Sequence, residues 1–284
     1  MTDPIALEHA GHRTWLKWHR GRRRREDPAF SGQRIVEGMR LGASVEVDLV
    51  VHAGPGFAVL HDLSLERETT GSGLVADHDA EQMRALRLRA EDGTALDEPV
   101  MLLEDLAALL ARQGLHADAL LQLDYKQDSA VLDPRAVAAF QRSMAPVARH
   151  MILSSGDAKS VELLSNGLPE LRIGYDPCHD PANLKLLAEQ RFTSFVRKAL
   201  LASPQAEMIY LNCALVLRAE LAGFDLVGAF HAEQRRVDAY TIQRADAQSL
   251  PAVRRLLALK VDQITTDDPE GLLTLLARPL SQTA

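Results

Sequence analysis

The sequence has little cysteine and no long apolar run. Its two cysteines, Cys178 and Cys213, are not in the close spacing of a metal or redox motif, which favours a reducing compartment over a disulfide-bonded fold. No apolar stretch reaches the roughly 18 residues of a membrane span, so we expect no stable membrane insertion. The first ten residues show neither the basic nor the apolar part of a secretory signal. These absences together predict a cytoplasmic protein.

Positive charge is also in deficit. The 32 Lys and Arg residues face 39 Asp and Glu, and the resulting net charge of -7 argues against nucleic acid as a partner. The chain is 46% hydrophobic and 25% charged, which excludes a disordered or low-complexity protein. No repeat, linker or break in composition divides the 284 residues. We therefore expect a single domain over residues 1–284.

Short apolar runs alternate with longer amphipathic segments along the whole chain. Several runs are rich in Val, Ile and Leu without strict alternation, as strands buried on both faces are. Eight strands, each followed by a helix, predict a (β/α)8 TIM barrel. An open doubly wound sheet is the alternative, but the glycine-rich phosphate loop of many such folds is missing after the first strand. The expected strands are Thr14–Trp18, Ser44–Val50, Ala119–Asp124, Met151–Ser154, Leu171–Gly174, Met208–Leu211, Val237–Ile242 and Val261–Thr265.

Helical periodicity fills several of the gaps between these strands. The segment Val51–Leu103 is longer than one crossover requires, so we expect a small insertion after the second strand, with an extra strand or hairpin near Phe57–His61. The expected helices are Phe30–Leu41, Leu102–Arg112, Pro134–Ala148, Asp246–Leu259 and Pro269–Ala277.

Acidic residues occur inside two of the predicted strands. Glu46 and Asp48 are two positions apart, so on a strand they point the same way, and Asp124 and Lys126 repeat that spacing on the next strand. Neighbouring carboxylates repel and are costly to desolvate, which a divalent cation resolves. Ligation by oxygen alone favours Mg²⁺ or Ca²⁺. The alternative is a buried layer of salt bridges, and the spacing alone leaves both open.

Two histidines follow the ends of predicted strands beside this acidic group. A lone histidine there is commonly a hydrogen-bonded structural residue, but His19 and His61 flank an acidic pair and can exchange protons near neutral pH. Arg20 offers a planar donor fork that suits phosphate oxygens. The combination predicts phosphoryl transfer or phosphodiester cleavage.

These residues resemble the motifs of the glycerophosphodiester phosphodiesterase family. Each motif is weak alone, but their order and strand positions make the combination specific, and the resemblance runs from His19 to about Leu273. The matching segments are His19-Arg20-Gly21, Gly42–Leu49, His61-Asp62, Arg67–Gly73, Met151–Ser155, Pro169–Gly174 and Val261–Pro269.

The resemblance implies a barrel with a small insertion and one bound divalent cation. It implies that Glu46, Asp48 and Asp124 hold the metal, that His19 and His61 form the acid–base pair, and that Arg20 and Lys126 contact phosphate. The activity expected is hydrolysis of a glycerophosphodiester to sn-glycerol 3-phosphate and an alcohol. Neither the alcohol, the choice between Mg²⁺ and Ca²⁺, nor the oligomeric state follows from the sequence.

Three segments depart from the family pattern. Asp124 stands where the family has Glu, which shortens one metal ligand by a methylene. The segment Arg22–Pro28 replaces the family's Pro-Glu-Asn-Thr, with Glu26-Asp27 as the substitute for Glu-Asn. Tyr240–Gln243 replaces Trp-Thr-Val-Asn, so Tyr240 is expected to line the substrate pocket in a different shape. These changes bear on substrate choice more than on reaction class.

The run Arg22–Arg25 has two interpretations. The first is a solvated loop paired with Glu and Asp residues elsewhere, or an oligomer contact. The second is a basic rim at the mouth of the barrel that attracts anionic substrates. Two other functions also stay open. One is a lysophospholipase D-like activity, for which Phe192–Phe195 and Ala199–Leu201 are the candidate apolar segments. The other is a barrel that binds phosphodiesters with little turnover.

Overall fold

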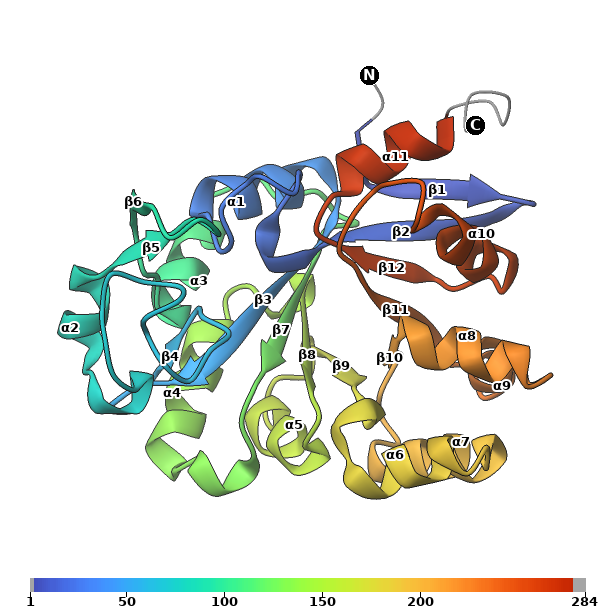
Figure 1. The fold of residues 1–284 in the computed structure, drawn as a ribbon. Helices are drawn as coiled ribbons and strands as arrows, with labels where there is room; N and C mark the ends of the chain where they lie inside the picture. The colour runs from blue at the N-terminus through green and yellow to red at the C-terminus, as the bar shows by residue number, and fades with distance from the viewer. Residues whose placement is uncertain (1–2, 278–284) are drawn as a thin grey trace.

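Eight parallel strands close into a barrel in the computed structural model, which describes residues 3–277 (Figure 1). Each strand pairs with the next one along the barrel, and the last pairs with the first, so the sheet has no open edge among these eight. The predicted TIM barrel is confirmed, and the closing pair rules out the doubly wound alternative. The barrel strands are β2 (His12–Trp18), β3 (Ser44–Val51), β7 (Leu120–Tyr125), β8 (Met151–Ser155), β9 (Arg172–Tyr175), β10 (Met208–Asn212), β11 (Arg236–Ile242) and β12 (Gln263–Thr266).

All eight strands lie within two residues of the expected boundaries. On β3 the outward side chains Val45, Val47 and Leu49 are fully buried between the barrel and the helices. Glu46 and Asp48 alternate with them and face the barrel interior, as residues two apart on a strand must. The apolar run thus predicted the strand correctly, and the two acidic residues within it lie on the face toward the barrel interior.

Helices surround the barrel, and the strands β9 and β10 are each followed by two of them. Helix α1 (Gly32–Leu41) shows how they attach, because Ile35 and Met39 are buried in the same cluster as Val45 and Trp18 of the barrel. The others are α3 (Leu103–Ala111), α4 (Pro134–Met144), α5 (Ala158–Ser165), α6 (Pro181–Ala188), α7 (Phe192–Ala202), α8 (Cys213–Leu221), α9 (Leu226–Ala232), α10 (Leu250–Ala258) and α11 (Pro269–Ala277).

The predicted insertion follows β3 and lies at the left of Figure 1. Its first strand, β4 (Phe57–Ala58), pairs antiparallel with the end of β3, as expected near Phe57–His61. The insertion also contains α2 (Ala80–Ala85) and a two-stranded hairpin of β5 (Arg87–Arg89) and β6 (Ala95–Pro99).

One further strand, β1 (Ala6–His9), was not predicted. It pairs antiparallel with β2 through a tight turn at Ala10 and Gly11, both of which have positive φ angles. This pattern is that of a two-residue hairpin loop, where a glycine relieves the strain of the left-handed conformation.

The segments considered for lipid contact are only partly buried. Phe192 and Phe195 of α7 pack into the core, whereas among the apolar side chains of these two segments Leu201 is well exposed, at 72%. In the described part of the chain, none of the helices has both the length and the apolar character needed to cross a bilayer.

Candidate active site

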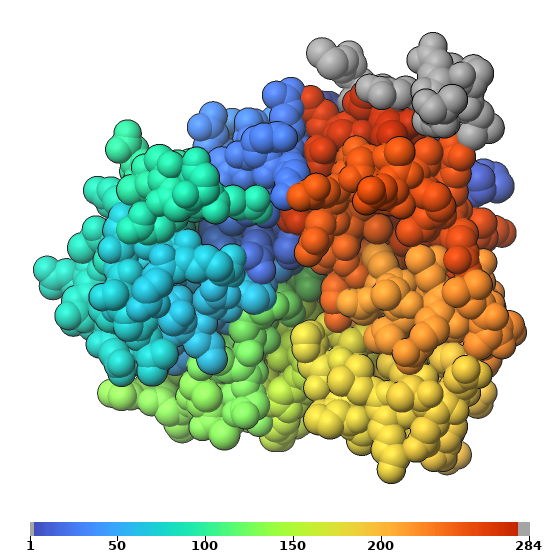
Figure 2. All heavy atoms as spheres, viewed as in Figure 1, coloured from blue at the N-terminus to red at the C-terminus, as the bar shows by residue number. Residues whose placement is uncertain are grey.

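A cavity of about 280 Å³ opens at the carboxyl ends of the barrel strands. In the space-filling view the molecule is hollowed near its centre, where segments from distant parts of the chain meet (Figure 2). Seven of the eight predicted site residues line the cavity, and the eighth, Asp48, pairs with two of them. The seven are His19, Arg20, Glu46, His61, Asp124, Lys126 and Tyr240.

Three carboxylates cluster at this cavity, two of them on its lining and Asp48 beside them. Asp48 and Asp124 are register partners on the neighbouring strands β3 and β7, and Glu46 lies one pleat below Asp48. Ligand atoms of the three side chains all lie within 4.8 Å of one another. Glu46 and Asp48 are almost fully buried, at 4% and 1% exposure. The sheet register therefore brings together the acids whose spacing predicted a cluster.

A tight turn at His19–Gly21 connects β2 to this cluster. Arg20 adopts a left-handed backbone conformation there, with φ of 54°. Its backbone N–H donates to Glu46 Oε2 at 2.7 Å, and its side-chain Nε lies 3.2 Å from Asp48 Oδ2. One residue thus contacts two acids, which accounts for a strained conformation that non-glycine residues rarely adopt.

Two cations face the three carboxylates. Lys126 Nζ lies 3.0 Å from Asp48 and 2.8 Å from Asp124, and Arg20 supplies the second positive charge. Burial raises the pKa of Glu46, and the charges of Asp48 and Asp124 raise it further. Burial alone would also raise the pKa of Asp48, but the positive charges of Lys126 and Arg20 outweigh it and lower that pKa. The cluster retains an excess of negative charge when all three acids are ionised.

The donor set fits a hard divalent cation. The ligands are oxygens only, which is the chemistry that Mg²⁺ and Ca²⁺ prefer. Both carboxylate oxygens of Asp48 are buried and accept no hydrogen bond within the described residues, so ion pairs alone hold them. A layer of salt bridges by itself would leave these strong acceptors poorly satisfied.

Each predicted catalytic histidine is paired with an aspartate. His19 Nδ1 lies 2.7 Å from Asp267 Oδ1, and His61 Nδ1 lies 2.8 Å from Asp62 Oδ1. With Nδ1 bonded to a carboxylate, Nε2 of each ring is left to exchange a proton. Both rings line the cavity, from β2 and from the start of the insertion. Two histidines placed in this way can serve as a general acid and a general base on one bound substrate.

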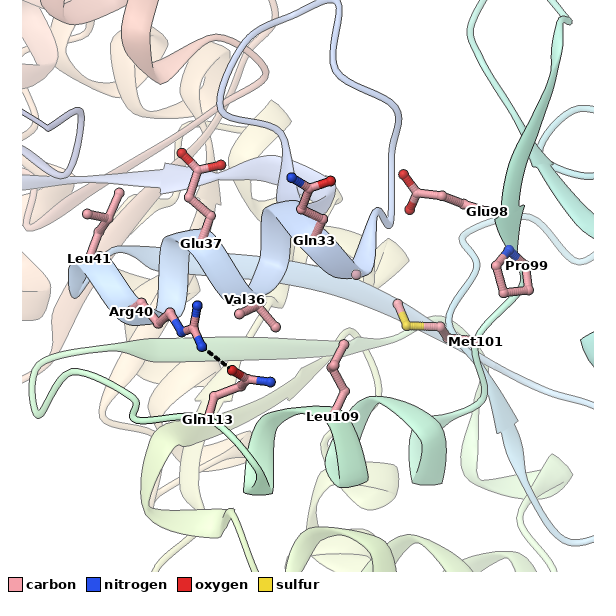
Figure 3. Close-up of a pocket in the computed structure, with 11 residues that line it drawn as sticks. Gln33, Val36, Glu37, Arg40, Leu41, Glu98, Pro99, Met101, Leu109 and Gln113 are labelled. Carbon is pink, nitrogen blue, oxygen red and sulfur yellow. Dashed lines mark hydrogen bonds between the residues drawn. The ribbon is translucent and has the colours of Figure 1, made fainter.

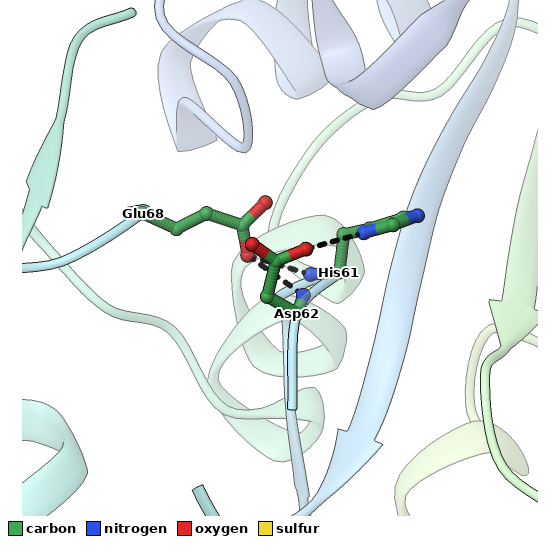
Figure 4. A group of neighbouring side chains, drawn as sticks. All are labelled: His61, Asp62 and Glu68. Carbon is green, nitrogen blue, oxygen red and sulfur yellow. Dashed lines mark hydrogen bonds and ion pairs between the residues drawn. The ribbon is translucent and has the colours of Figure 1, made fainter. Parts of the chain in front are cut away.

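The His61 pair rests on a small scaffold (Figure 4). Glu68 Oε2 accepts the backbone N–H groups of His61 and Asp62, at 2.9 and 3.0 Å. Arg67 hydrogen-bonds Asp62 and so lowers the pKa of that carboxyl to about 2. His61, Asp62 and Glu68 lie close enough to hold a metal, but these contacts already occupy Glu68 and Asp62.

A chain of hydrogen bonds crosses the barrel interior to the acidic cluster. Lys17 pairs with Asp238 at 3.1 Å and donates to Gln122 Oε1. Because Lys17 can only donate, the Gln122 amide is oriented with its NH₂ toward Ser154 Oγ, at 2.8 Å. The Ser154 hydroxyl then donates its proton to Asp124 Oδ1 at 2.7 Å. Donor–acceptor chemistry thus fixes the direction of the whole chain.

Several residues of the site were missed at the sequence level. Asp176 and His179 form a third histidine–aspartate pair on the cavity wall, at 3.2 Å, and the hydrogen bond to Asp176 raises the pKa of His179. Asp267 lies in the matched segment Val261–Pro269, but its partner His19 is 248 residues away in the sequence, so their pairing was not predicted. The clearest available signal was Asp176, a carboxylate directly after the apolar run of β9.

The arginine run forms ion pairs. Of its side chains only Arg24 is well exposed, at 57%. All four are paired with acidic residues of other elements, as one of the two interpretations predicted. The partners are Asp267 and Glu91 for Arg22, Glu37, Glu270 and Asp3 for Arg23, Glu270 for Arg24, and Glu91 for Arg25.

A larger groove of about 770 Å³ lies outside the barrel, between helices α1 and α3 (Figure 3). Arg40 and Gln113 are hydrogen-bonded across it, and Met101 and Leu109 form its apolar side. It contains no histidine and no paired carboxylates among its lining residues. The size of a cavity therefore does not identify the active site. The groups that can do chemistry line the smaller cavity at the carboxyl ends of the barrel strands.

A barrel mouth with an acidic cluster, two cations and two histidine–aspartate pairs has the groups of a phosphoric diester hydrolase. Sequence comparison agrees, because residues 37–271 match the model of the glycerophosphoryl diester phosphodiesterase family. The chain belongs to this family, and the family and enzyme class predicted from its motifs are confirmed. Among curated proteins, sequence comparison finds no match.

Solved structures of similar fold include phosphodiesterases from several organisms. A Parabacteroides distasonis glycerophosphoryl diester phosphodiesterase is 17% identical with a TM-score of 0.63, covering 99% of this chain and 90% of its own. An Agrobacterium tumefaciens glycerophosphodiester phosphodiesterase is 19% identical with a TM-score of 0.62, at 92% and 99% coverage. An Oleispira antarctica phosphodiesterase, solved with the product sn-glycerol-3-phosphate, is 15% identical with a TM-score of 0.64, at 93% and 96% coverage. At these identities the likeness shows the fold.

Proposed function

We propose that the chain acts as a single domain that hydrolyses glycerophosphodiesters to sn-glycerol 3-phosphate and an alcohol, with the help of one divalent cation. The observation that carries this proposal is the placement of two histidine–aspartate pairs on the same cavity as the acidic cluster. The family match and the product bound in the Oleispira antarctica neighbour support the substrate class.

Glu46, Asp48 and Asp124 would hold the cation. Mg²⁺ and Ca²⁺ both suit these ligands. A cation held there would polarise a phosphate oxygen and offset the negative charge of the substrate. Arg20 and Lys126, which already face the acids, then bind the remaining phosphate oxygens and stabilise charge that develops during the reaction.

His19 and His61 exchange the protons of the reaction. One Nε2 accepts a proton from the attacking hydroxyl, which belongs either to water or to the neighbouring glycerol hydroxyl of the substrate. In the second case the product of this step is a cyclic phosphate, which a water molecule opens to glycerol 3-phosphate in a second step with the roles of the two histidines reversed. As the new O–P bond forms and the ester O–P bond breaks, the other Nε2 donates a proton to the departing alkoxide. Asp267 and Asp62 hold the rings in the tautomer that this requires.

Tyr240 would form the substrate-facing wall on the opposite side of the cavity, together with Gln243. A lysolipid substrate would need an apolar surface beside this wall. Of the segments considered, Phe192 and Phe195 are buried and Leu201 is exposed, so they offer little apolar surface for a lysolipid.

The test is release of glycerol 3-phosphate from glycerophosphocholine, glycerophosphoethanolamine and glycerophosphoglycerol. Each assay is run with Mg²⁺, with Ca²⁺ and with EDTA. We expect turnover that EDTA abolishes and that added metal restores. Binding of these substrates without turnover under any metal would instead support a phosphodiester-binding barrel.

The histidines are tested by His19→Ala and His61→Ala. Each should lower kcat by at least about 100-fold, the usual contribution of a general acid or base, while the thermal transition stays cooperative. His231→Ala is a matched control, since His231 also pairs with an aspartate, Asp262 at 2.8 Å, but does not line the cavity. Near-wild-type activity of either cavity variant would remove that histidine from the mechanism.

A further inference from the structure

A second cavity of about 280 Å³ adjoins the active site. It lies between the β2–α1 loop and the insertion, and Arg20 lines both cavities. Four arginines surround it, from three separate segments of the chain, together with two glutamates and a few apolar side chains. The arginines are Arg20, Arg22, Arg67 and Arg89.

We propose that this arginine cavity is a second anion subsite, which binds a phosphate group on the alcohol moiety of the substrate. The inference rests on the proposed function, because it extends the same substrate beyond the phosphodiester. It predicts a preference for glycerophosphodiesters whose alcohol carries a further phosphate.

Arg89 is the residue that gives the cavity its free charge. Its Nε donates to the carbonyl of Thr69 and its Nη1 to the carbonyl of Gly93, both at 2.6 Å. It forms no ion pair with any residue in the range 3–277. A guanidinium has five N–H donors, so two carbonyl contacts fix its position and leave its charge and remaining donors available.

The two glutamates of the cavity are already compensated. Glu68 accepts two backbone N–H groups and lies within ion-pair distance of Arg67 and Arg20, at 2.9 and 3.6 Å. Glu91 pairs with Arg22 at 3.1 Å. Neither carboxylate contacts Arg89, so the cavity presents an unpaired guanidinium to an incoming anion.

Arg20 connects the two sites. Its guanidinium lies between Asp48, in the acidic cluster, and Glu68, in the arginine cavity. A substrate that spans both cavities would place its phosphodiester on one side of this side chain and its second phosphate on the other. Such a bridging cation favours two phosphates over one, because it lowers the repulsion between them.

The test compares two substrates that differ by one phosphate, glycerophosphoinositol and glycerophosphoinositol 4-phosphate. The readout is the ratio of their kcat/KM values. The wild type should prefer the phosphorylated substrate, and Arg89→Gln should lower the ratio by about tenfold or more, the range expected for one charge-assisted hydrogen bond. Glu91→Gln should raise the ratio, since it removes a negative charge and one of the two carboxylates that pair with Arg22.

Arg84→Gln is the matched control. Arg84 belongs to the same insertion but pairs with Glu104 and Asp105 at 2.8 Å, and it does not line the cavity. Its variant should keep the wild-type ratio. A ratio that is the same in wild type, Arg89→Gln and Glu91→Gln would overturn the subsite. Failure of the wild type to cleave either substrate would count against the proposed function instead.

Inhibition by inorganic phosphate tests whether the arginine cavity binds a phosphate group of the substrate or whether free phosphate binds only at the catalytic centre. If the subsite serves the substrate, phosphate should compete more strongly against the phosphorylated substrate, and Arg89→Gln should remove the difference. Equal inhibition of both substrates that Arg89→Gln leaves unchanged would place the ion at the catalytic centre and contradict the proposal.

Discussion

Removal of the Ser154 hydroxyl should weaken metal binding without altering any of the three proposed metal ligands. In Ser154→Ala, Asp124 Oδ1 loses the donor at 2.7 Å that fixes its direction, and Gln122 Nε2 loses its acceptor. Ser154 is fully buried, so water does not readily replace the hydroxyl. Outer partners of metal ligands typically contribute 10- to 100-fold in affinity, and we expect a loss of about tenfold or more for Mg²⁺ or Mn²⁺.

The assay is calorimetric titration of the metal into wild type and variants. Ser160→Ala is a close control, because the Ser160 hydroxyl is also fully buried and also donates to an aspartate, Asp157, at 2.7 Å, but outside the acidic cluster. Ser154→Thr keeps the hydroxyl and should retain most of the affinity.

A double-mutant cycle with Asp124→Glu sharpens the test. The longer glutamate moves its carboxylate away from Ser154, so Ser154→Ala should have a smaller effect in that background. If Ser154→Ala binds metal as tightly as wild type, or Ser160→Ala weakens binding equally, the hydroxyl does not position Asp124.

Two further predictions concern stability. Gly174→Ala would place a Cβ 2.5 Å from Cε2 of Tyr210, so it should lower the free energy of unfolding by about 1–3 kcal/mol in urea titrations, whereas Gly114→Ala meets open space and should change it little. Burial alone would raise the pKa of Asp267, but its hydrogen bond from His19 outweighs this and lowers that pKa. A lowered folded pKa stabilises the protein above the ordinary value of 3.8 and loses that stabilisation as pH falls. The stability difference between wild type and Asp267→Asn should therefore shrink between about pH 5 and pH 2, and a difference independent of pH would refute this assignment.

The local sequence pattern predicted the barrel well, since each strand is a short apolar run. On β3, polar residues at every second position identify the face toward the barrel interior. Glu46 and Asp48 show why the site was also accessible from sequence. They interrupt the apolar run on one face only, and the pairing of β3 with β7 then brings Asp124 beside them. Strand order alone is enough to assemble the acidic cluster.

What the sequence did not predict depends on strand pairing and on the geometry of turns. The hydrogen bonds of Ser154 arise from the pairing of β8 with β7, which no spacing in the chain encodes. The pairing of Asp176 with His179 is local, between residues three apart, and depends on the turn that follows β9. The position of Arg89 likewise depends on backbone geometry, since its carbonyl partners are Gly93, four residues later, and Thr69, which forms an isolated β-bridge with Leu88. Such polar contacts follow from the fold and leave no periodic signal.

The pairing of β2 with β12 has a consequence for biosynthesis. His19 is oriented by Asp267, a residue 248 positions later, which leaves the ribosome roughly 12 to 50 seconds after it at typical elongation rates. During that interval the first strand has no closing neighbour, and one of the two proposed catalytic histidines has no carboxylate to hold it. The nascent chain therefore cannot form the pair of His19 and Asp267 until β12 has been synthesised, and translation itself delays the proposed activity until the barrel can close.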